Sequence, residues 1–468
     1  MKVCLIVEGA YPYIRGGVSS WMQNLMVRMP DVEFVIETIV ARPEEKREFK
    51  YEIPSNVSEI RETYLLDDDV IHGRRQRKRK LSKREYEAFE SLLFGVDPDW
   101  KTIIQFFEER NVSLNSFLIG EDFLKMVQTY YMEHFERMIF SDFLWTMRSM
   151  YLPLFTILKS QRVECDLYHS VSNGYAGLWA TAQKLFYKKP FLMTEHGIYT
   201  REREEEIIKA NWVRGVYKDL WIDQFKKIGR CGYTYADKVV SLFEEARQFQ
   251  IELGCPREKT IVIPNGVHAK RFEGIPQKEE GDDWIHVGAV LRVTPIKDVK
   301  TLISSYMLAK QQEPKLKLWI MGNMDEDPEY AKECKNMVEN LKIPDVIFTG
   351  TINVMEYIGK MDIMVLSSIS EGQPLSILEG FAAQKPFITT NVGNCHGLIY
   401  GEHDSYGSAG YVVPVMGVSR MAECMVRLAQ SSEERKRMGE IAYQRVIEHY
   451  DDFDIYQRYY HLYQEMIG

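Results

Sequence analysis

The sequence from Ser367 to Gln384, SSISEGQPLSILEGFAAQ, directly follows the apolar run IMVL at residues 363–366. A short β-branched and leucine run, a polar turn and then apolar residues spaced three and four apart predict a strand, a loop and a helix. Pro374 suits the first helical turn, where its missing N–H costs nothing. This order predicts a binding loop at the carboxyl end of a strand.

Two glutamates flank the start of the predicted helix. Glu371 lies in the loop, and Glu379 follows it by little more than two helical turns, on roughly the same side. Carboxylates accept hydrogen bonds from the hydroxyls of a sugar or ribose, while the backbone amides of Gly372 and Gln373 face an anion at a helix N-terminus. The stretch therefore predicts a nucleotide-sugar site, although an exposed glutamate on an ordinary helix gives the same spacing.

The second half of the chain alternates apolar strands with helices, which predicts a parallel, doubly wound sheet. Arg292 and Lys297 lie five residues apart after the strand at 284–290. Two cations there can neutralise the charge of a leaving nucleoside diphosphate. Gly322 lies at another strand end, where a base-binding glycine and an ordinary loop glycine are both compatible with the pattern.

The first half begins in the same way. A strand at 3–7 leads into the loop that contains Gly16 and Gly17, and a helix follows. Glycines at this point let the backbone approach a diphosphate, but they also suit a plain tight turn. His196 follows the strand at 190–194 and is expected at the ligand crevice or, as a structural histidine, in the core. Asn265 belongs to a Pro-Asn-Gly turn before a polar linker.

Together these motifs resemble the retaining glycosyltransferases of family 4, which have the GT-B fold. The paired glutamates in the frame E-G-x-P-L-x-x-L-E, the arginine and lysine before them, the G-G loop, the His-Gly and the Pro-Asn-Gly-Val carry the resemblance. The order of the segments, with EGAYPY near the start, GGVSSW and EHGIYTRER, is similar to the PelF-like branch of Pel exopolysaccharide synthesis.

The resemblance implies a role for each of these residues. It assigns catalysis to His196, Arg292, Lys297 and Glu371. Binding of the substrate or nucleotide is assigned to Gly16, Gly17, Asn265, Gly322, Gly372, Gln373, Pro374, Leu375 and Glu379. No carboxylate stands out as the nucleophile of a double displacement, so the resemblance implies front-side transfer with retention, in which Arg292 and Lys297 stabilise the departing diphosphate.

The resemblance also implies the substrates and partners. The donor is expected to be a UDP-sugar and the acceptor a growing polysaccharide, with membrane subunits of a synthesis complex as partners. No cofactor and no metal are expected, because GT-B families hold the diphosphate without one. Two rival classes remain: another GT-B enzyme, such as an epimerase or a phosphorylase, and a non-catalytic scaffold subunit.

The expected fold is α/β, with two Rossmann-like domains. Residues 1–275 form the acceptor-side domain with a helical insertion at about 42–160, and residues 276–450 form the nucleotide-sugar domain. The segment 451–468 is expected to be a helix that crosses back to the N-terminal domain.

Composition narrows the function classes. A net charge of −9 over 468 residues argues against general nucleic-acid binding. Seven scattered cysteines without a C-x-x-C pair suit a reducing compartment. Without a signal sequence or an apolar span, the chain is expected in the cytoplasm.

One local charge pattern departs from this acidic balance. The basic run at 74–84 is either a solvated loop or a patch that recruits the protein to the inner face of a membrane. The Asp67–Asp69 triplet before it is not taken as a metal-binding D-x-D.

Overall fold

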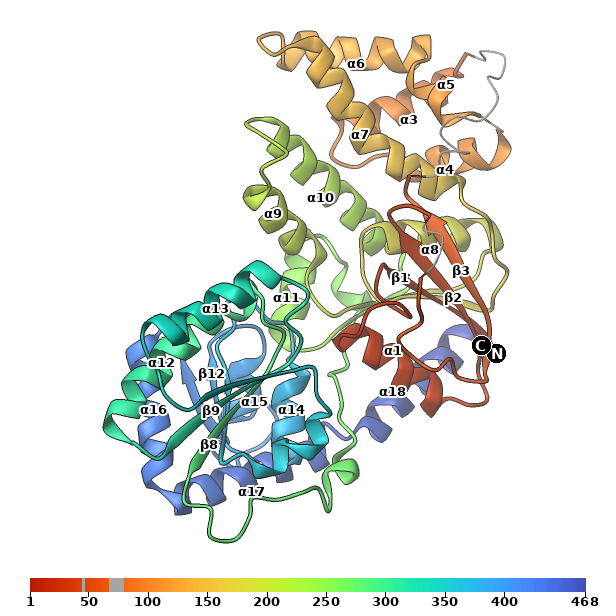
Figure 1. Ribbon diagram of the computed structural model, residues 1–468. Helices are drawn as coiled ribbons and strands as arrows, with labels where there is room; N and C mark the ends of the chain where they lie inside the picture. Colours follow the sequence, from red (N-terminus) through yellow and green to blue (C-terminus); the bar gives the residue numbers. More distant parts are fainter. Residues whose placement is uncertain (44–46, 67–79, 111) are drawn as a thin grey trace. The chain divides into compact units, whose positions relative to one another are not determined.

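The computed structural model describes residues 1–43, 47–66, 80–110 and 112–468 (Figure 1). The chain forms two compact units, one of Met1–Val262 with Tyr460–Gly468 and one of Ile263–Tyr459. The boundary expected near residue 275 therefore falls inside the second unit. The acidic triplet at 67–69 and residues 74–79 of the basic run lie outside the described residues.

The first unit is built on a seven-stranded sheet in the order β3-β2-β1-β4-β5-β6-β7, and the recorded strand pairs are parallel. Its strands are β1 (Lys2–Glu8), β2 (Glu33–Val40), β3 (Val57–Tyr64), β4 (Leu167–Ser170), β5 (Phe191–Glu195), β6 (Lys238–Ser241) and β7 (Thr260–Val262). The central strands are almost entirely buried because helices cover both faces of a parallel sheet.

The described part of the expected helical insertion contains both a strand and helices. β3 pairs with β2 in the first part of it, and the described helices lie between residues 83 and 159. The sequence VSEIRETY of β3 places three charged residues in an edge strand, so it lacks the apolar signal of a buried strand. The helices are α3 (Lys83–Phe94), α4 (Trp100–Glu109), α5 (Leu114–Leu118), α6 (Glu121–His134) and α7 (Phe140–Lys159).

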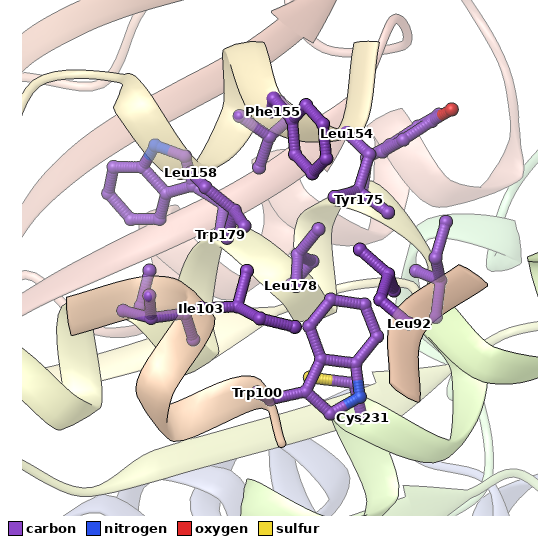
Figure 2. Packing of buried hydrophobic residues seen from close by; sticks show 14 of the residues in the cluster. Leu92, Trp100, Ile103, Leu154, Phe155, Leu158, Tyr175, Leu178, Trp179 and Cys231 are labelled. Carbon is purple, nitrogen blue, oxygen red and sulfur yellow. The ribbon is translucent and has the colours of Figure 1, made fainter. Parts of the chain in front are cut away.

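A continuous apolar core joins this insertion to the sheet domain. Figure 2 shows Leu92 of α3 and Trp100 of α4 pointing toward Leu178 of α8 (Tyr175–Tyr187) and Cys231 of α10 (Tyr217–Tyr235). These side chains are at most 4% exposed. Fully burying one large apolar side chain stabilises a protein by about 1.5–3 kcal/mol, so the insertion is held to the sheet domain by its core. The remaining helices of this unit are α1 (Gly17–Arg28), α9 (Tyr199–Lys209), α11 (Glu244–Glu252) and the end of α18 (Asp452–Ile467).

The second unit repeats the plan with a six-stranded parallel sheet in the order β10-β9-β8-β11-β12-β13. The strands are β8 (Ile285–Val290), β9 (Leu316–Met321), β10 (Val346–Gly350), β11 (Ile363–Leu366), β12 (Phe387–Thr390) and β13 (Gly410–Val413). Its α-helices are α12 (Val299–Gln312), α13 (Pro328–Asn340), α14 (Leu375–Ala382), α15 (Cys395–Tyr400), α16 (Val418–Gln430), α17 (Ser432–His449) and the first part of α18.

Strand order reverses at one point in each sheet. In the first sheet the chain proceeds outward from β1 and then returns to β4, and in the second it proceeds from β8 and returns to β11. Ligands of doubly wound sheets bind outside the carboxyl ends of the strands at such a point. The two Rossmann-like sheets predicted from the sequence are confirmed, and each has its own switch point. Among the described residues, no helix combines the length and the apolar character needed to cross a bilayer.

Candidate active site

Lys297 and Glu371 meet at the switch point of the second sheet. Lys297 ends a short 3-10 turn after β8, and Glu371 lies in the loop between β11 and α14. The ammonium Nζ donates to Glu371 Oε1, and Ser368 Oγ donates to the same oxygen. The lysine and glutamate side chains are only 16% and 10% exposed, so little water screens the pair.

Two hydrogen bonds to backbone carbonyls hold the two loops against each other. Ser367 Oγ donates to the carbonyl of Lys297 at 2.8 Å, and Ile369 N donates to the carbonyl of Ile296 at 2.8 Å. These contacts satisfy backbone carbonyls of the loop that have no hydrogen-bond partner in a β-sheet. The position of the Lys297–Glu371 pair is therefore set by the backbone as well as by its charges.

Arg292 pairs with a carboxylate outside the loop that carries Glu371. Its Nη1 donates to both carboxylate oxygens of Glu326, at 2.6 and 2.8 Å, in the segment after β9. Both side chains are nearly half exposed, at 47% and 43%. The structure thus brings Lys297 to Glu371, while Arg292 forms a surface pair with a glutamate that the sequence analysis did not single out.

Asn265 is joined to the loop that precedes α14. Its backbone N donates to Gln373 Oε1 at 2.5 Å, and its Nδ2 donates to the Gln373 carbonyl at 3.1 Å. Both side chains are 5% exposed, and Gln373 Nε2 has no partner among the described residues. Pro374 is the N-cap and Leu375 the first residue of α14, so these two residues start the helix behind Gly372 and Gln373.

Two glycines allow close backbone approach around this loop. A Cβ on Gly393, whose φ is +49°, would lie 2.1 Å from the carbonyl oxygen of Gly372. One on Gly322, with φ +155°, would lie 1.8 Å from the carbonyl oxygen of Leu291. Gly322 is thus required by a backbone contact, whatever it does toward a ligand.

Glu379 lies in α14 and is partly buried. Burial raises the pKa of its carboxyl to about 7, against the opposing effect of the nearby charge of Arg271. Arg271 lies in the 3-10 turn Ala269–Phe272 of the predicted linker, and no sequence motif marks it as a site residue. A carboxyl with a pKa near 7 is partly protonated at physiological pH, and its protonated form can both donate and accept hydrogen bonds.

In the first unit, His196 directly follows β5. Its ring lies edge-on to Trp21 of α1, with 4.8 Å between ring centroids. Burial lowers the pKa of His196 to about 4, so the imidazole is neutral at pH 7. Its Nε2 is buried and has no hydrogen-bond partner within the described parts of the chain, which leaves one ring nitrogen available.

A second histidine, His169 in β4, also lies edge-on to Trp21. Its Nδ1 lies 2.6 Å from Tyr463 Oη and its Nε2 lies 2.9 Å from Thr194 Oγ1. Burial, with a smaller contribution from the charge of His196, lowers the pKa of His169 to about 3. The contact with Tyr463 spans 294 residues, so no local pattern could have predicted it.

Glu195, next to His196, points into the core. It accepts hydrogen bonds from Tyr233 Oη at 2.7 Å and Gln250 Nε2 at 3.0 Å. Burial raises the pKa of its carboxyl to about 7, although both donors favour the charged form. Glu195 therefore fixes the end of β5 that carries His196.

Gly16 and Gly17 begin α1. Gly16 is the N-cap in an extended conformation, and an added Cβ there would meet no atom within 4 Å. Packing alone therefore does not require glycine at this position. In the described part of the chain, no group of three or more His, Cys, Asp or Glu residues is arranged to hold a metal ion.

Two family models match the chain. "Domain of unknown function (DUF3492)" matches residues 1–258, and "Glycosyl transferases group 1" matches residues 271–445. The first covers more than half of the chain and includes His196. The second includes the loops that carry Lys297 and Glu371.

Curated relatives also show similarity. The chain is 27% identical over 271 residues to an N,N'-diacetylbacillosaminyl-diphospho-undecaprenol alpha-1,3-N-acetylgalactosaminyltransferase of Campylobacter jejuni, covering 55% of this chain and 66% of that protein. It is 28% identical over 248 residues to the N-acetyl-alpha-D-glucosaminyl L-malate synthase of Bacillus anthracis, covering 53% and 61%. The chain thus spans somewhat less than two thirds of the length of these two relatives.

Solved structures share the fold across the whole chain. Anabaena HepE in complex with UDP has a TM-score of 0.63 at 15% identity and covers 99% of this chain and 100% of its own. Sucrose-phosphate synthase from Thermosynechococcus elongatus has a TM-score of 0.62 at 14% identity and covers 99% and 98%. The chain therefore belongs to the family described as "Domain of unknown function (DUF3492)" and carries, in its second half, a group 1 glycosyltransferase domain in a GT-B fold.

Proposed function

We propose that the protein is a retaining glycosyltransferase that transfers a sugar from a UDP-sugar to a growing exopolysaccharide, in the manner of the PelF-like branch. The observation that carries the proposal is the partly buried Lys297–Glu371 pair at the switch point of the second sheet. An ammonium has three donors, so Lys297 can keep Glu371 and also bind a phosphate oxygen. The carboxylate can then accept hydrogen bonds from hydroxyls of the donor sugar.

In this proposal, transfer takes place on one face of the sugar. The bond between the anomeric carbon and the diphosphate oxygen breaks, and the acceptor oxygen bonds to the same face. The acceptor proton passes to the departing diphosphate, whose charge Lys297 and Arg292 neutralise. His196 would contact the donor sugar as a neutral imidazole, a role that rests on the family resemblance.

The donor class is supported by the structural neighbours. Structures of Anabaena HepE contain UDP and UDP-glucose, respectively. A polysaccharide acceptor, a metal-independent reaction and membrane subunits as partners extend the proposal from the family resemblance. Recruitment to the inner face of a membrane belongs to the same extension, and co-purification with membranes after deletion of residues 74–79 tests it.

A panel of nucleotide sugars, assayed for UDP release and for sugar transfer, tests the function. Lys297→Ala should lower turnover at least about a hundredfold, the usual effect of losing one group that stabilises transition-state charge. Lys300→Ala is the matched control, because Lys300 follows closely in sequence but pairs with Glu333 at the surface. Unchanged turnover in folded Lys297→Ala would remove this lysine from the mechanism.

The same panel separates the rival classes. Formation of a free sugar phosphate would identify a phosphorylase, and a change of the sugar without transfer would identify an epimerase. A scaffold that has lost its site would give no heat with UDP in calorimetry. Retention is tested by the anomeric configuration of the product in NMR spectra.

A further inference from the structure

The first unit contains a hollow lined by lysines. It lies near the amino end of β5, the opposite end of the strand from His196. The hollow has a volume of about 690 Å³, and its lining includes Lys101, Lys184, Lys188, Lys189 and Lys238. Two carboxylates, Asp237 and Glu465, also line it. Such an excess of cations is unexpected in a chain whose net charge is −9.

The hollow is distinct from the candidate active site. Lys189 and Pro190 immediately precede β5, whereas His196 immediately follows that strand. A strand of five residues spans about 16 Å. Lys188, Lys189 and Lys238 therefore lie at the amino ends of β5 and β6, whereas His196 lies at the carboxyl end of β5.

Within the described ranges, one lining lysine has an acidic partner. Lys184 Nζ lies 2.5 Å from Asp237 Oδ1, and Asp237 Oδ2 accepts a hydrogen bond from Phe191 N at 2.9 Å. Among the described residues, no ion pair is recorded for the other four lining lysines. Nearby, burial and then the charge of Lys184 lower the pKa of Lys259, as expected next to concentrated positive charge.

Stabilisation of helix ends does not account for this arrangement. Cations are favourable at helix C-termini, which explains Lys184 in the last turn of α8. Lys101, however, lies in the first turn of α4, where a positive charge is unfavourable. Lys188 has φ +56°, a left-handed conformation that helices usually assign to glycine at this position.

We propose that this hollow binds a nucleotide-sized polyanion with clustered phosphates. Its volume falls within the range of about 300–1,000 Å³ that is usual for small-molecule sites. Several ammonium groups around one concave surface can each donate to a phosphate oxygen. Leu185, Pro190 and Met466 complete the lining and supply an apolar surface for a base or sugar ring.

Calorimetric titration of the full-length protein with tripolyphosphate and with ATP tests the proposal. The same titrations of Lys297→Ala show how much of the binding comes from the proposed donor site. Saturable binding of either probe is expected. Equal affinity for the two probes would indicate that the hollow recognises the phosphates alone. Tighter binding of ATP would indicate that the apolar wall also contacts the base or sugar.

The variant Lys188→Glu/Lys189→Glu should weaken binding of both probes more than tenfold. Lys332→Glu/Lys436→Glu is the matched control, because it changes the net charge equally at two exposed lysines elsewhere. Lys101→Gln, a single substitution on another wall of the hollow, should also weaken binding and does not depend on folding of the double variant.

Three results would overturn the proposal: no binding of either probe, equal loss in the control variant, or binding that Lys297→Ala abolishes. Binding of anionic vesicles with no binding of the two probes would instead identify a membrane-contact surface and would also refute it. None of these outcomes depends on glycosyl transfer, so failure here is separate from failure of the proposed function.

Discussion

The Lys297–Glu371 pair predicts a measurable coupling between two side chains that lie 74 residues apart in sequence. We expect Lys297→Ala and Glu371→Ala each to lower the free energy of unfolding, because each leaves a partly buried charge without its partner. The double variant should be more stable than the sum of the two losses predicts. A thermodynamic cycle over the four proteins isolates this coupling.

The magnitude follows from exposure. Fully buried pairs lose about 3–5 kcal/mol when one partner is removed, and exposed pairs contribute about 0.2–1 kcal/mol. At 16% and 10% exposure the pair lies near the buried limit, but Glu371 retains the hydrogen bond from Ser368. We therefore expect each single variant to lose about 2 kcal/mol and the coupling to be about 1–2 kcal/mol.

Urea unfolding, followed by circular dichroism and tryptophan fluorescence, provides the free energies. Lys315 and Asp283 form the control pair in the same unit, with 3.2 Å between their charged atoms and exposures of 60% and 81%. Their coupling should be below about 0.5 kcal/mol and should decline further at high salt. If Lys297 and Glu371 couple no more strongly than this surface pair, the inference that burial makes their contact strong is refuted.

Three further predictions concern other residues of the candidate active site: Glu379, His196 and Gly393. Burial raises the pKa of Glu379 to about 7 from an ordinary 4.5, so the stability of the native protein should fall as pH rises through that range. In urea unfolding, Glu379→Gln should therefore be about 2 kcal/mol more stable than the parent at pH 8 but not at pH 4.5. Burial lowers the pKa of His196 to about 4 from 6.5, so the parent protein should lose stability as pH falls below 6.5. Between pH 7 and pH 4.5, His196→Phe should lose about 2 kcal/mol less than the parent. An equal dependence of stability on pH in the two proteins would contradict the lowered pKa. Gly393→Ala should lower the melting temperature more than Gly407→Ala, because the Cβ at residue 393 would lie 2.1 Å from the carbonyl oxygen of Gly372. Gly407 also has a positive φ, +102°, but a Cβ there would meet no atom closer than 3.7 Å. A similar loss in both variants would rule out the close contact as the cause.

The sequence predicted those features that depend on local pattern. Apolar runs between turn residues gave the central strands of both sheets, because buried parallel strands need nearly continuous apolar side chains. The loop at 367–374 was located for the same reason, since strand, glycine turn and helix follow one another without interruption. In contrast, β3 carries three charged residues at a sheet edge, and its pairing with β2 has no local signal.

Most partners of the candidate residues were outside the reach of sequence patterns. Glu326 accepts from Arg292, and Arg271 affects the pKa of Glu379, but both are ordinary surface charges in the sequence. The contact between Asn265 and Gln373 joins residues 108 positions apart. Such contacts arise when strand order brings distant loops to one edge of a sheet, so they require the tertiary fold.

The two units hold titratable groups differently at the carboxyl ends of their sheets. In the first, burial lowers the pKa of His196 and raises that of Glu195, so each environment disfavours the ionised side chain. In the second, Lys297 and Glu371 form an ion pair that two loops hold in place.

Under the proposed reaction, the difference between neutral groups in the first unit and an ion pair in the second has a physical reason. A sugar hydroxyl is uncharged and is well served by neutral donors and acceptors, whereas a departing diphosphate requires a fixed positive charge, because its own charge increases as the glycosidic bond breaks. A fixed positive charge placed where negative charge develops stabilises the transition state more than the bound substrates, and that difference is what accelerates a reaction.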